Sequence, residues 1–337
     1  MIDDLFVFDG VCHVYDMADD NLRLERPDTP AFVDSWRREV GAMRYPSEGH
    51  FGGDFEWKRQ FGLDDMYKLM FVESPVDMAM ACAVPVWDWF PDSFSPLRLN
   101  YEFAAANPDR VLLCGAVDPI HHGVDGALKE MEYQVRELGA KSFKFYNGHI
   151  DKSWRCDDRE VAYPLYRKAA ELGIEFLQFH KGLPFGEWDV DVLRPVDIQA
   201  PAREFRELKF VIHHLALPYF DEALSIAARF PNVYLALSGV MNYLRIAPVE
   251  VYHQIGRLLR NVGSHKLIWG SEASMTGLPG PFLKSFAELQ IPEELCDGWG
   301  YPQITREDKR KILGENMAGL LGIDVPAKVK HLEKLGR

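Results

Sequence analysis

The sequence lacks the features that define several classes of protein. Its 337 residues contain five cysteines, an odd number, and no Cys-x-x-Cys spacing, so neither a disulfide framework nor a structural zinc knuckle is expected. No uninterrupted apolar run approaches the ~18 residues that a membrane span needs. The acidic start, Met1 to Asp4, lacks the basic and apolar segments of a signal peptide. We therefore expect a cytoplasmic protein that does not associate with a membrane.

Basic residues and nucleotide-binding motifs are also scarce. The chain has 38 Lys and Arg against 51 Asp and Glu, a net charge of −13, and no basic stripe, which argues against a nucleic-acid partner. Neither Gly-x-Gly-x-x-Gly after the first strand nor Gly-x-x-x-x-Gly-Lys-[Ser/Thr] occurs, so we expect no organic cofactor. A small anionic substrate remains compatible with the charge, because local Arg or Lys can override the global field.

What the sequence does contain is a regular alternation of short apolar runs and helical patterns. Runs that are apolar throughout are typical of parallel strands buried on both faces, and eight of them favour a (β/α)8 barrel, here a single domain over residues 1–337. The predicted strands are Leu5 to Phe8, Met78 to Val84, Val111 to Val117, Ser142 to Tyr146, Ile174 to Phe179, Lys209 to Ile212, Val233 to Leu237 and Lys266 to Gly270.

Two segments interrupt this alternation. Residues 16–73 form a long insert after the first strand, which is typical of a lid or binding element; helices are possible at 31–40 and 64–71. Residues 277–301 are expected to be irregular, because they begin with a Gly/Pro-rich loop. Helices are predicted at 96–107, 126–138, 158–172, 196–205, 220–230, 249–261 and 306–321.

Four of the predicted strands end at a histidine or an acid. His13, His180 and His214 follow the first, fifth and sixth strands, and Glu272 follows the eighth. The carboxyl ends of barrel strands form the rim where active sites lie. Each group alone is compatible with a structural hydrogen bond, but together they predict a metal site. Imidazole suits zinc, manganese or iron, and a carboxylate supplies an anionic ligand.

These motifs and their order resemble the amidohydrolase superfamily. The resemblance is to the branch of metal-dependent decarboxylases of aromatic and unsaturated acids, such as aminocarboxymuconate-semialdehyde decarboxylase and the hydroxybenzoate decarboxylases. It covers essentially the whole chain. The matching motifs are Val11-Cys12-His13, His180, His214-Leu215-Ala216, Gly270-Ser271-Glu272 and Gly314-Glu315-Asn316.

The resemblance implies roles for these residues. His13, His180 and Glu272 would bind a divalent metal, zinc or manganese, while Val11 occupies the family's usual first ligand position. Three protein ligands plus water are sufficient for a catalytic site. His214 would be the general acid/base and Glu272 would also carry protons. In an extended strand His213 would point away from His214, so only His214 is expected to face the site.

Other residues are candidates for binding the substrate. Lys144, toward the end of the fourth strand, could meet a substrate carboxylate or could pair with an acid inside the barrel. Arg44, His50 and Trp57 in the insert could recognise an anionic aromatic substrate or could lie on a solvated surface. A homo-oligomer is possible, as in other family members.

Three functions remain open from the sequence. The first is a metal-dependent, non-oxidative decarboxylase of a small aromatic or unsaturated carboxylic acid. The second is a hydrolase of an amide, ester or lactone on the same scaffold, with or without a metal. The third is a barrel that binds a ligand without catalysis. The sequence does not identify the substrate.

Overall fold

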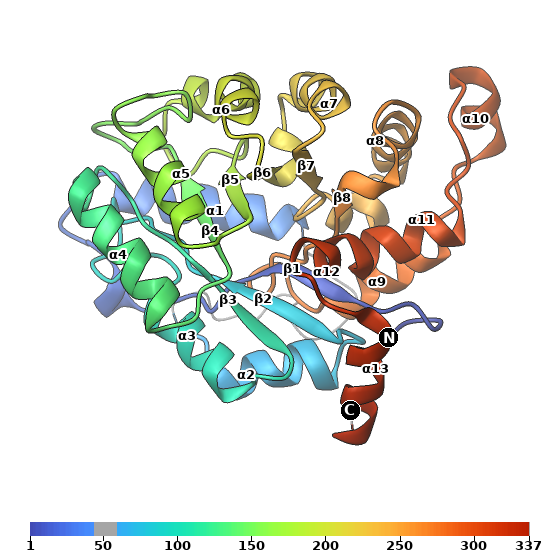
Figure 1. The fold of residues 1–337 in the computed structure, drawn as a ribbon, viewed down its shortest axis with the longest axis horizontal. Helices are drawn as coiled ribbons and strands as arrows, with labels where there is room; N and C mark the ends of the chain where they lie inside the picture. Colours follow the sequence, from blue (N-terminus) through green and yellow to red (C-terminus); the bar gives the residue numbers. More distant parts are fainter. Residues whose placement is uncertain (44–58, 337) are drawn as a thin grey trace.

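The fold is a (β/α)8 barrel (Figure 1). The structure, a computed structural model, describes residues 1–43 and 59–336. Eight parallel strands pair in sequence order, as predicted. They are β1 (Phe8–Cys12), β2 (Met78–Cys82), β3 (Val111–Gly115), β4 (Ser142–Tyr146), β5 (Phe176–His180), β6 (Lys209–Ile212), β7 (Val233–Ala236) and β8 (Leu267–Ile268).

The predicted position of the first strand was wrong. β1 begins at Phe8, where the prediction ended, and extends through Asp9 and Gly10 to Cys12. Asp and Gly are unusual in strands, but Gly10 is needed here, because a Cβ would lie 2.9 Å from both Ile268 Cγ2 and the carbonyl oxygen of Trp269. This close approach lets β1 pack directly against β8 and the residue that follows it.

Hydrogen bonds between β1 and the segment after β8 bring the barrel close to closure. Gly10 N donates to the oxygen of Trp269 at 3.0 Å, and Glu272 N donates to the oxygen of Val11 at 3.0 Å. A register shift between Asp9 and Cys12 marks an irregularity in β1. The backbone of Glu272 is therefore fixed directly against β1.

The helices surround the sheet, and most lie where the sequence predicts them. In α8, for example, Val251, Ile255 and Leu258 are buried at helical spacing on one face. The helices are α1 (Thr29–Met43), α2 (Leu63–Tyr67), α3 (Leu97–Ala106), α4 (Val124–Arg136), α5 (Ala162–Glu171), α6 (Gln199–Glu204), α7 (Phe220–Arg229), α8 (Pro248–Asn261), α9 (Pro279–Glu288), α10 (Glu293–Trp299), α11 (Arg306–Arg310), α12 (Asn316–Leu320) and α13 (Val325–Lys334).

The expectation of an irregular segment at residues 277–301 was wrong, because α9 and α10 lie within it. Pro279 is the first residue of α9, where its missing N–H requires no partner and its fixed φ suits a helix. The Gly/Pro-rich pattern therefore marks the start of a helix, and Phe282, Leu283 and Phe286 anchor that helix in the core.

The core has two layers, and the inner one fills the barrel. Alternate residues of a strand point to the same face; Met78, Met80 and Cys82 of β2 accordingly share one buried cluster with Val11 and Ile268. The other cluster lies largely between the sheet and the helices. The barrel interior is thus closed by side chains, and any cavity must form at a rim.

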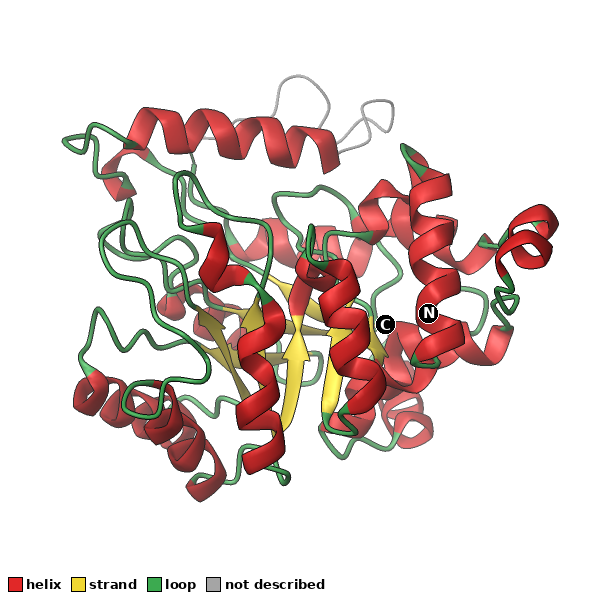
Figure 2. Cartoon of the chain, turned by 90° about the horizontal axis from the view of Figure 1, so that it is seen from above, coloured by secondary structure: helices red, strands yellow, loops and turns green. Residues whose placement is uncertain are grey.

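The insert contributes the helix that covers one rim. Figure 2 shows α1 lying across the end of the barrel toward which the strand arrows point. Phe32, Trp36 and Val40, on one face of α1, are buried. Within the described residues, no helix is both long and apolar enough to span a membrane.

Candidate active site

The barrel brings the predicted chemical groups to the rim beneath α1. His13 lies one residue after β1, Lys144 is in the middle of β4, and His180 is the last residue of β5. His214 lies in η5 (His213–Ala216), directly after β6, and Glu272 follows β8. All five side chains are at most slightly exposed: none exceeds 12%.

Glu272 is surrounded by three nitrogen-bearing side chains. Its Oε2 lies 3.1 Å from His13 Nε2, while its Oε1 lies 3.6 Å from Lys144 Nζ and 3.9 Å from His214 Nδ1. Lys144 Nζ is also 3.5 Å from His13 Nε2. Oε1 is buried and accepts no hydrogen bond from a described residue. The carboxylate can therefore still accept a ligand or a proton.

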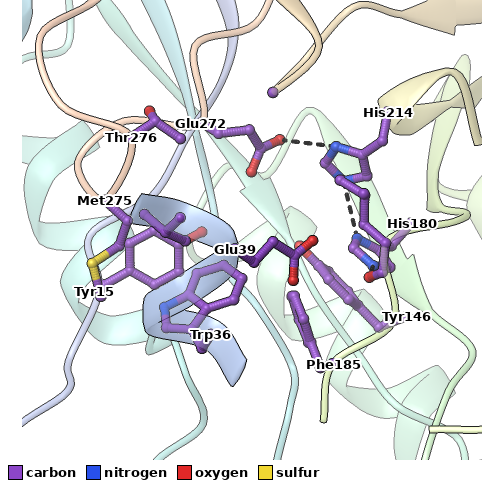
Figure 3. A pocket seen from close by; sticks show the side chains of 13 residues that line it. Tyr15, Trp36, Glu39, Tyr146, His180, Phe185, His214, Glu272, Met275 and Thr276 are labelled. Atoms are coloured by element: carbon purple, nitrogen blue, oxygen red, sulfur yellow. Dashed lines mark hydrogen bonds and ion pairs between the residues drawn. The ribbon is translucent and has the colours of Figure 1, made fainter. Parts of the chain in front are cut away.

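His180 and His214 form a second pair. His214 Nε2 lies 3.0 Å from His180 Nδ1, and the ring centroids are 4.7 Å apart. Figure 3 shows the chain of contacts from Glu272 through His214 to His180. The site thus consists of two linked pairs of polar groups at the barrel rim.

Backbone carbonyls determine where the ring hydrogens lie. A carbonyl oxygen only accepts, so the ring nitrogen that faces it must donate. The contacts are His13 Nδ1 to Cys82 O at 2.5 Å, His180 Nε2 to Leu183 O at 2.9 Å, and His214 Nδ1 to Ser238 O at 3.0 Å. In each neutral ring the other nitrogen carries a lone pair. These lone pairs face Glu272 or one another.

Burial and charge hold this set in definite ionisation states. Burial lowers the pKa of His13 and His180, and it lowers the pKa of His214 to about 4 despite the nearby Glu272 charge. Burial alone would raise the pKa of Glu272, but Lys144, His214 and His13 hold it well below its usual range. At neutral pH the site therefore contains neutral imidazoles and an ionised carboxylate.

His213 and His214 were predicted to point to opposite sides of a strand, and of the two only His214 lines the cavity described below. The chain leaves the extended conformation after Ile212, with positive φ at His214, Leu215 and Ala216, so the alternation of a strand does not apply. His213, His214 and Glu272 form a group of three possible ligands whose atoms lie within 4.8 Å of one another. Both ring nitrogens of His213 already have partners, Ser238 Oγ at 3.1 Å and Gln178 Oε1 at 2.8 Å.

Three of the five rim groups face a cavity of about 430 Å³, a volume that includes the open space at its mouth. His180, His214 and Glu272 are in its wall, together with aromatic side chains and part of α1. Tyr146 stacks on His180 with 4.7 Å between centroids. The remaining lining residues are Tyr15, Trp36, Glu39, Val40, Leu183, Phe185, Gly239, Met275 and Thr276. A flat, partly apolar ligand fits such a lining.

Of the predicted substrate-binding residues, Lys144 alone belongs to the described part of the chain. Lys144 is fully buried and does not line the cavity; it contacts Glu272 and His13 from inside the barrel. Its interaction with a barrel acid is one of the two alternatives considered from the sequence. Arg44, His50 and Trp57 fall outside the described residues. His13, a predicted ligand, contacts the site through Glu272 and is likewise absent from the cavity wall.

Sequence reasoning missed Glu39, a second carboxyl in this cavity. It lies in the helix predicted over 31–40, which was treated only as part of an insert. Its spacing from Trp36 indicated a shared helical face, but no motif indicated that this face would cover the rim. Burial raises the pKa of Glu39 to about 7.

A separate polar cluster lies along the same rim. His149, in the loop after β4, is 3.1 Å from Asp118 Oδ2 and 3.6 Å from Asp88 Oδ2. Asp88 also accepts a hydrogen bond from Trp188 Nε1 at 3.1 Å. This cluster joins the loops after β2, β3, β4 and β5 and does not line the cavity beneath α1.

Comparison with known proteins shows which family the chain belongs to. A family model described as amidohydrolase matches residues 12–323. The L-fucono-1,5-lactonase of Burkholderia ambifaria is 28% identical over 142 residues, which cover 39% of this chain and 48% of the lactonase. The chain spans less than half the length of the curated relatives that it matches.

Solved structures share the fold. A TIM-barrel protein of Bordetella bronchiseptica has a TM-score of 0.67 and 19% identity, covering 94% of this chain and 99% of that one. The 5-carboxyvanillate decarboxylase of Novosphingobium aromaticivorans, complexed with manganese and 4-hydroxy-3-methoxy-5-nitrobenzoic acid, has a TM-score of 0.59 and 13% identity, covering 95% and 97%. Since the family model spans nearly the whole barrel, the chain belongs to the amidohydrolase family of enzymes.

Proposed function

We propose that this enzyme is a metal-dependent, non-oxidative decarboxylase of a small aromatic or unsaturated carboxylic acid. The observation that carries the proposal is the arrangement of the three imidazoles. Each donates one ring N–H to a backbone carbonyl and turns its other nitrogen toward a second acceptor. Metal-binding histidines are typically held in this way.

The donor types at the rim, imidazole and carboxylate, are those that a divalent cation takes, and within the described residues His213, His214 and Glu272 are the three whose ligand atoms lie within 4.8 Å of one another. Two neutral imidazole nitrogens that face each other at 3.0 Å, His180 Nδ1 and His214 Nε2, repel unless a proton or a cation lies near them. His13 Nε2 and Glu272 Oε2 are a second such pair at 3.1 Å, and here the Lys144 ammonium lies 3.5 Å from the nitrogen. We assign His13, His180 and Glu272 as the ligands, with His214 adjacent. Zinc and manganese both accept imidazole and carboxylate ligands.

The bound metal would act as a Lewis acid on an oxygen of the substrate. Lys144 and Glu272 form a buried pair whose opposite charges cancel. The positive charge of a bound metal would then be offset by the negative charge of an anionic substrate. The aromatic wall of Tyr146 and Phe185 would hold the ring and exclude water. This combination supports a flat carboxylic acid as the substrate.

His214 is the residue that we assign to proton transfer. It lines the cavity, and because its pKa is lowered to about 4 it is neutral at pH 7, so it would first accept a proton and then donate it to the substrate. In the reaction, the ring carbon that bears the carboxylate gains a proton, the carbon–carbon bond breaks, and its electrons return to the ring as carbon dioxide leaves. Glu272, next to His214, would relay the proton from solvent.

A lactonase is the second candidate, favoured by the 28% identity with L-fucono-1,5-lactonase. The same groups could serve hydrolysis, because Glu272 and His214 can accept a proton from an attacking water. The match covers only 39% of this chain, whereas the aromatic lining of the cavity favours a planar ring. We therefore place it second.

One pair of assays separates the two functions. Release of carbon dioxide from 2,6-dihydroxybenzoate and 5-carboxyvanillate would be measured beside proton release from L-fucono-1,5-lactone, with zinc- or manganese-loaded enzyme. We expect carbon dioxide release that is lost in His214→Ala and retained in the control His331→Ala, whose side chain pairs with Asp109 on the surface. Lactone hydrolysis without carbon dioxide release would replace the first proposal with the second.

We further propose that the enzyme acts in the cytoplasm on a small anionic substrate. The Lys144 cation behind Glu272 at the rim supports an anionic substrate.

A further inference from the structure

The helix α1 presents a polar group to the cavity from the side opposite Glu272. Trp36, Glu39 and Val40 of α1 line the cavity at spacings of three and four residues, so they share one helical face. In contrast, Asp34 of the same helix is exposed. Of these two acids, only Glu39 faces the chemistry.

The Glu39 carboxyl extends into the cavity toward Tyr146 and Phe185 (Figure 3). Its oxygens accept no hydrogen bond from any residue in the described ranges 1–43 and 59–336, and most of its side chain is shielded from solvent. A largely buried carboxyl without a donor destabilises a fold. A ligand in the cavity that donates a hydrogen bond to the Glu39 carboxyl would offset this loss of stability.

The charges at the two ends of the cavity define an orientation for the ligand. The rim of the barrel offers Glu272 with His180 and His214, backed by the Lys144 cation, and this end suits a carboxylate bound through a metal. The α1 end offers a carboxylate with no cation that contacts it in the described residues. A second carboxylate there would be repelled, whereas an O–H group would be accepted.

We propose that Glu39 is a specificity-determining residue that accepts a hydrogen bond from a hydroxyl group at the end of the substrate remote from its carboxylate. This rests on the proposed function, because it assumes that the substrate carboxylate lies at the barrel rim. It narrows the substrate class to hydroxylated aromatic or enolic acids. The elevated pKa of Glu39, about 7, agrees with a carboxyl that lacks a donor in the free protein.

The test compares three ligands that differ only at the remote end. Isothermal titration of the metal-loaded full chain at pH 8 would measure 4-hydroxybenzoate, 4-methoxybenzoate and terephthalate. A hydrogen bond to a charged group is worth about 1.5–3 kcal/mol, which corresponds to about 10- to 100-fold in affinity. We expect this preference for the hydroxyl over the methoxy ligand, and the weakest binding for terephthalate.

Three variants test whether Glu39 causes the preference for the hydroxyl ligand over the methoxy ligand. In Glu39→Ala the hydroxyl preference should fall to less than about 3-fold, and in Glu39→Gln terephthalate should bind better than in the wild type, because the repelling charge is gone. Asp34→Asn, which removes an exposed acid from the same helix, should behave as the wild type does. An unchanged preference in Glu39→Ala would overturn the role of Glu39 and leave the proposed function intact. If none of the three ligands binds the wild type, both the substrate class and the role of Glu39 are overturned.

The unfolding temperature, measured without any ligand, tests whether the Glu39 carboxylate lacks a partner within the fold. Burial raises the pKa of Glu39 in the folded state to about 7, above its pKa in the unfolded chain. The carboxylate therefore begins to destabilise the fold once the pH exceeds the unfolded-state pKa, and the destabilisation is complete above about pH 7. Glu39→Gln should therefore raise the unfolding temperature at pH 8 and change it little at pH 5. A lower unfolding temperature at pH 8 would mean that the fold pairs Glu39 internally, and the proposal would fall. The titratable groups that line the same cavity are Tyr15, Tyr146, His180, His214 and Glu272, and Tyr243 interacts electrostatically with Glu39.

Discussion

The chemistry of the site depends on which nitrogen of each histidine carries the hydrogen. Three backbone carbonyls decide this for His13, His180 and His214. The strand-end rule predicted from sequence that these residues gather at one rim, but it contains no information on ring orientation. Ring orientation depends on carbonyls of other strands and loops, which become neighbours only in the folded barrel.

His214→Ala tests proton transfer at the residue scale. The variant should fold as the wild type does, and its kcat should fall by about 10²- to 10⁴-fold, the usual contribution of a general acid/base. Circular dichroism and the kinetics of carbon dioxide release measure the two effects. A variant with wild-type kcat would remove His214 from the mechanism.

Val11→Asp tests the departure from the family's ligand pattern. Val11 is fully buried beside Ile268 in the barrel interior, so an unpaired carboxylate there should lower the free energy of unfolding by ~3 kcal/mol or more. If the position adjoins the metal, added zinc should recover most of this loss and bind more tightly than in the wild type. Metal affinity equal to that of the wild type would show that Val11 is remote from the metal.

At the scale of elements, the loops after β5 and β6 meet so closely that one glycine is required. Gly182 has φ 69°, and a Cβ there would overlap the carbonyl oxygen of Leu217. The loop sequence gave no sign of this contact, which joins segments about 35 residues apart. For the same reason the positive φ of His214, where the chain leaves the extended conformation, could not be predicted from strand alternation.

Gly182→Ala should therefore destabilise the protein far more than a glycine substitution in open space. Gly139 is the matched control, because it has φ 73° and a Cβ there would meet nothing within 4 Å. We expect Gly139→Ala to cost about 1–2 kcal/mol, the penalty of the left-handed conformation alone, and Gly182→Ala at least twice that. Urea unfolding measures both. Equal losses would mean that the β5 and β6 loops can separate freely.

The cluster of His149, Asp88 and Asp118 makes the loops sensitive to pH. Burial alone would lower the pKa of His149, but Asp118 and Asp88 raise it to about 9. A pKa raised above the unfolded value gives stability that is complete below about 6.5 and is lost as pH rises through about 9. The difference in unfolding free energy between the wild type and His149→Asn should shrink between pH 7 and 10. Parallel pH profiles would show that His149 is not charged in the fold.

At the scale of the whole molecule, the order of the elements was predictable. Eight apolar runs indicated the barrel, and the family resemblance agreed with it. The helix α1 was predicted approximately, yet its role was not, because its place over the rim depends on how the insert folds back on the barrel (Figure 2). That is why Glu39 was missed, while Arg44, His50 and Trp57 remain predictions.

The central claim is that His13, His180 and Glu272 hold a divalent metal, and metal affinity tests it most directly. Elemental analysis and chelator-buffered titration of zinc and manganese would be made on the wild type, Glu272→Gln and the control His331→Ala. We predict about one tightly bound metal per chain in the wild type and the control, and an affinity at least ~10-fold weaker in Glu272→Gln, which loses the anionic ligand and leaves Lys144 unopposed. A wild-type protein that takes up neither metal, or a Glu272→Gln variant of unchanged affinity, would contradict the account.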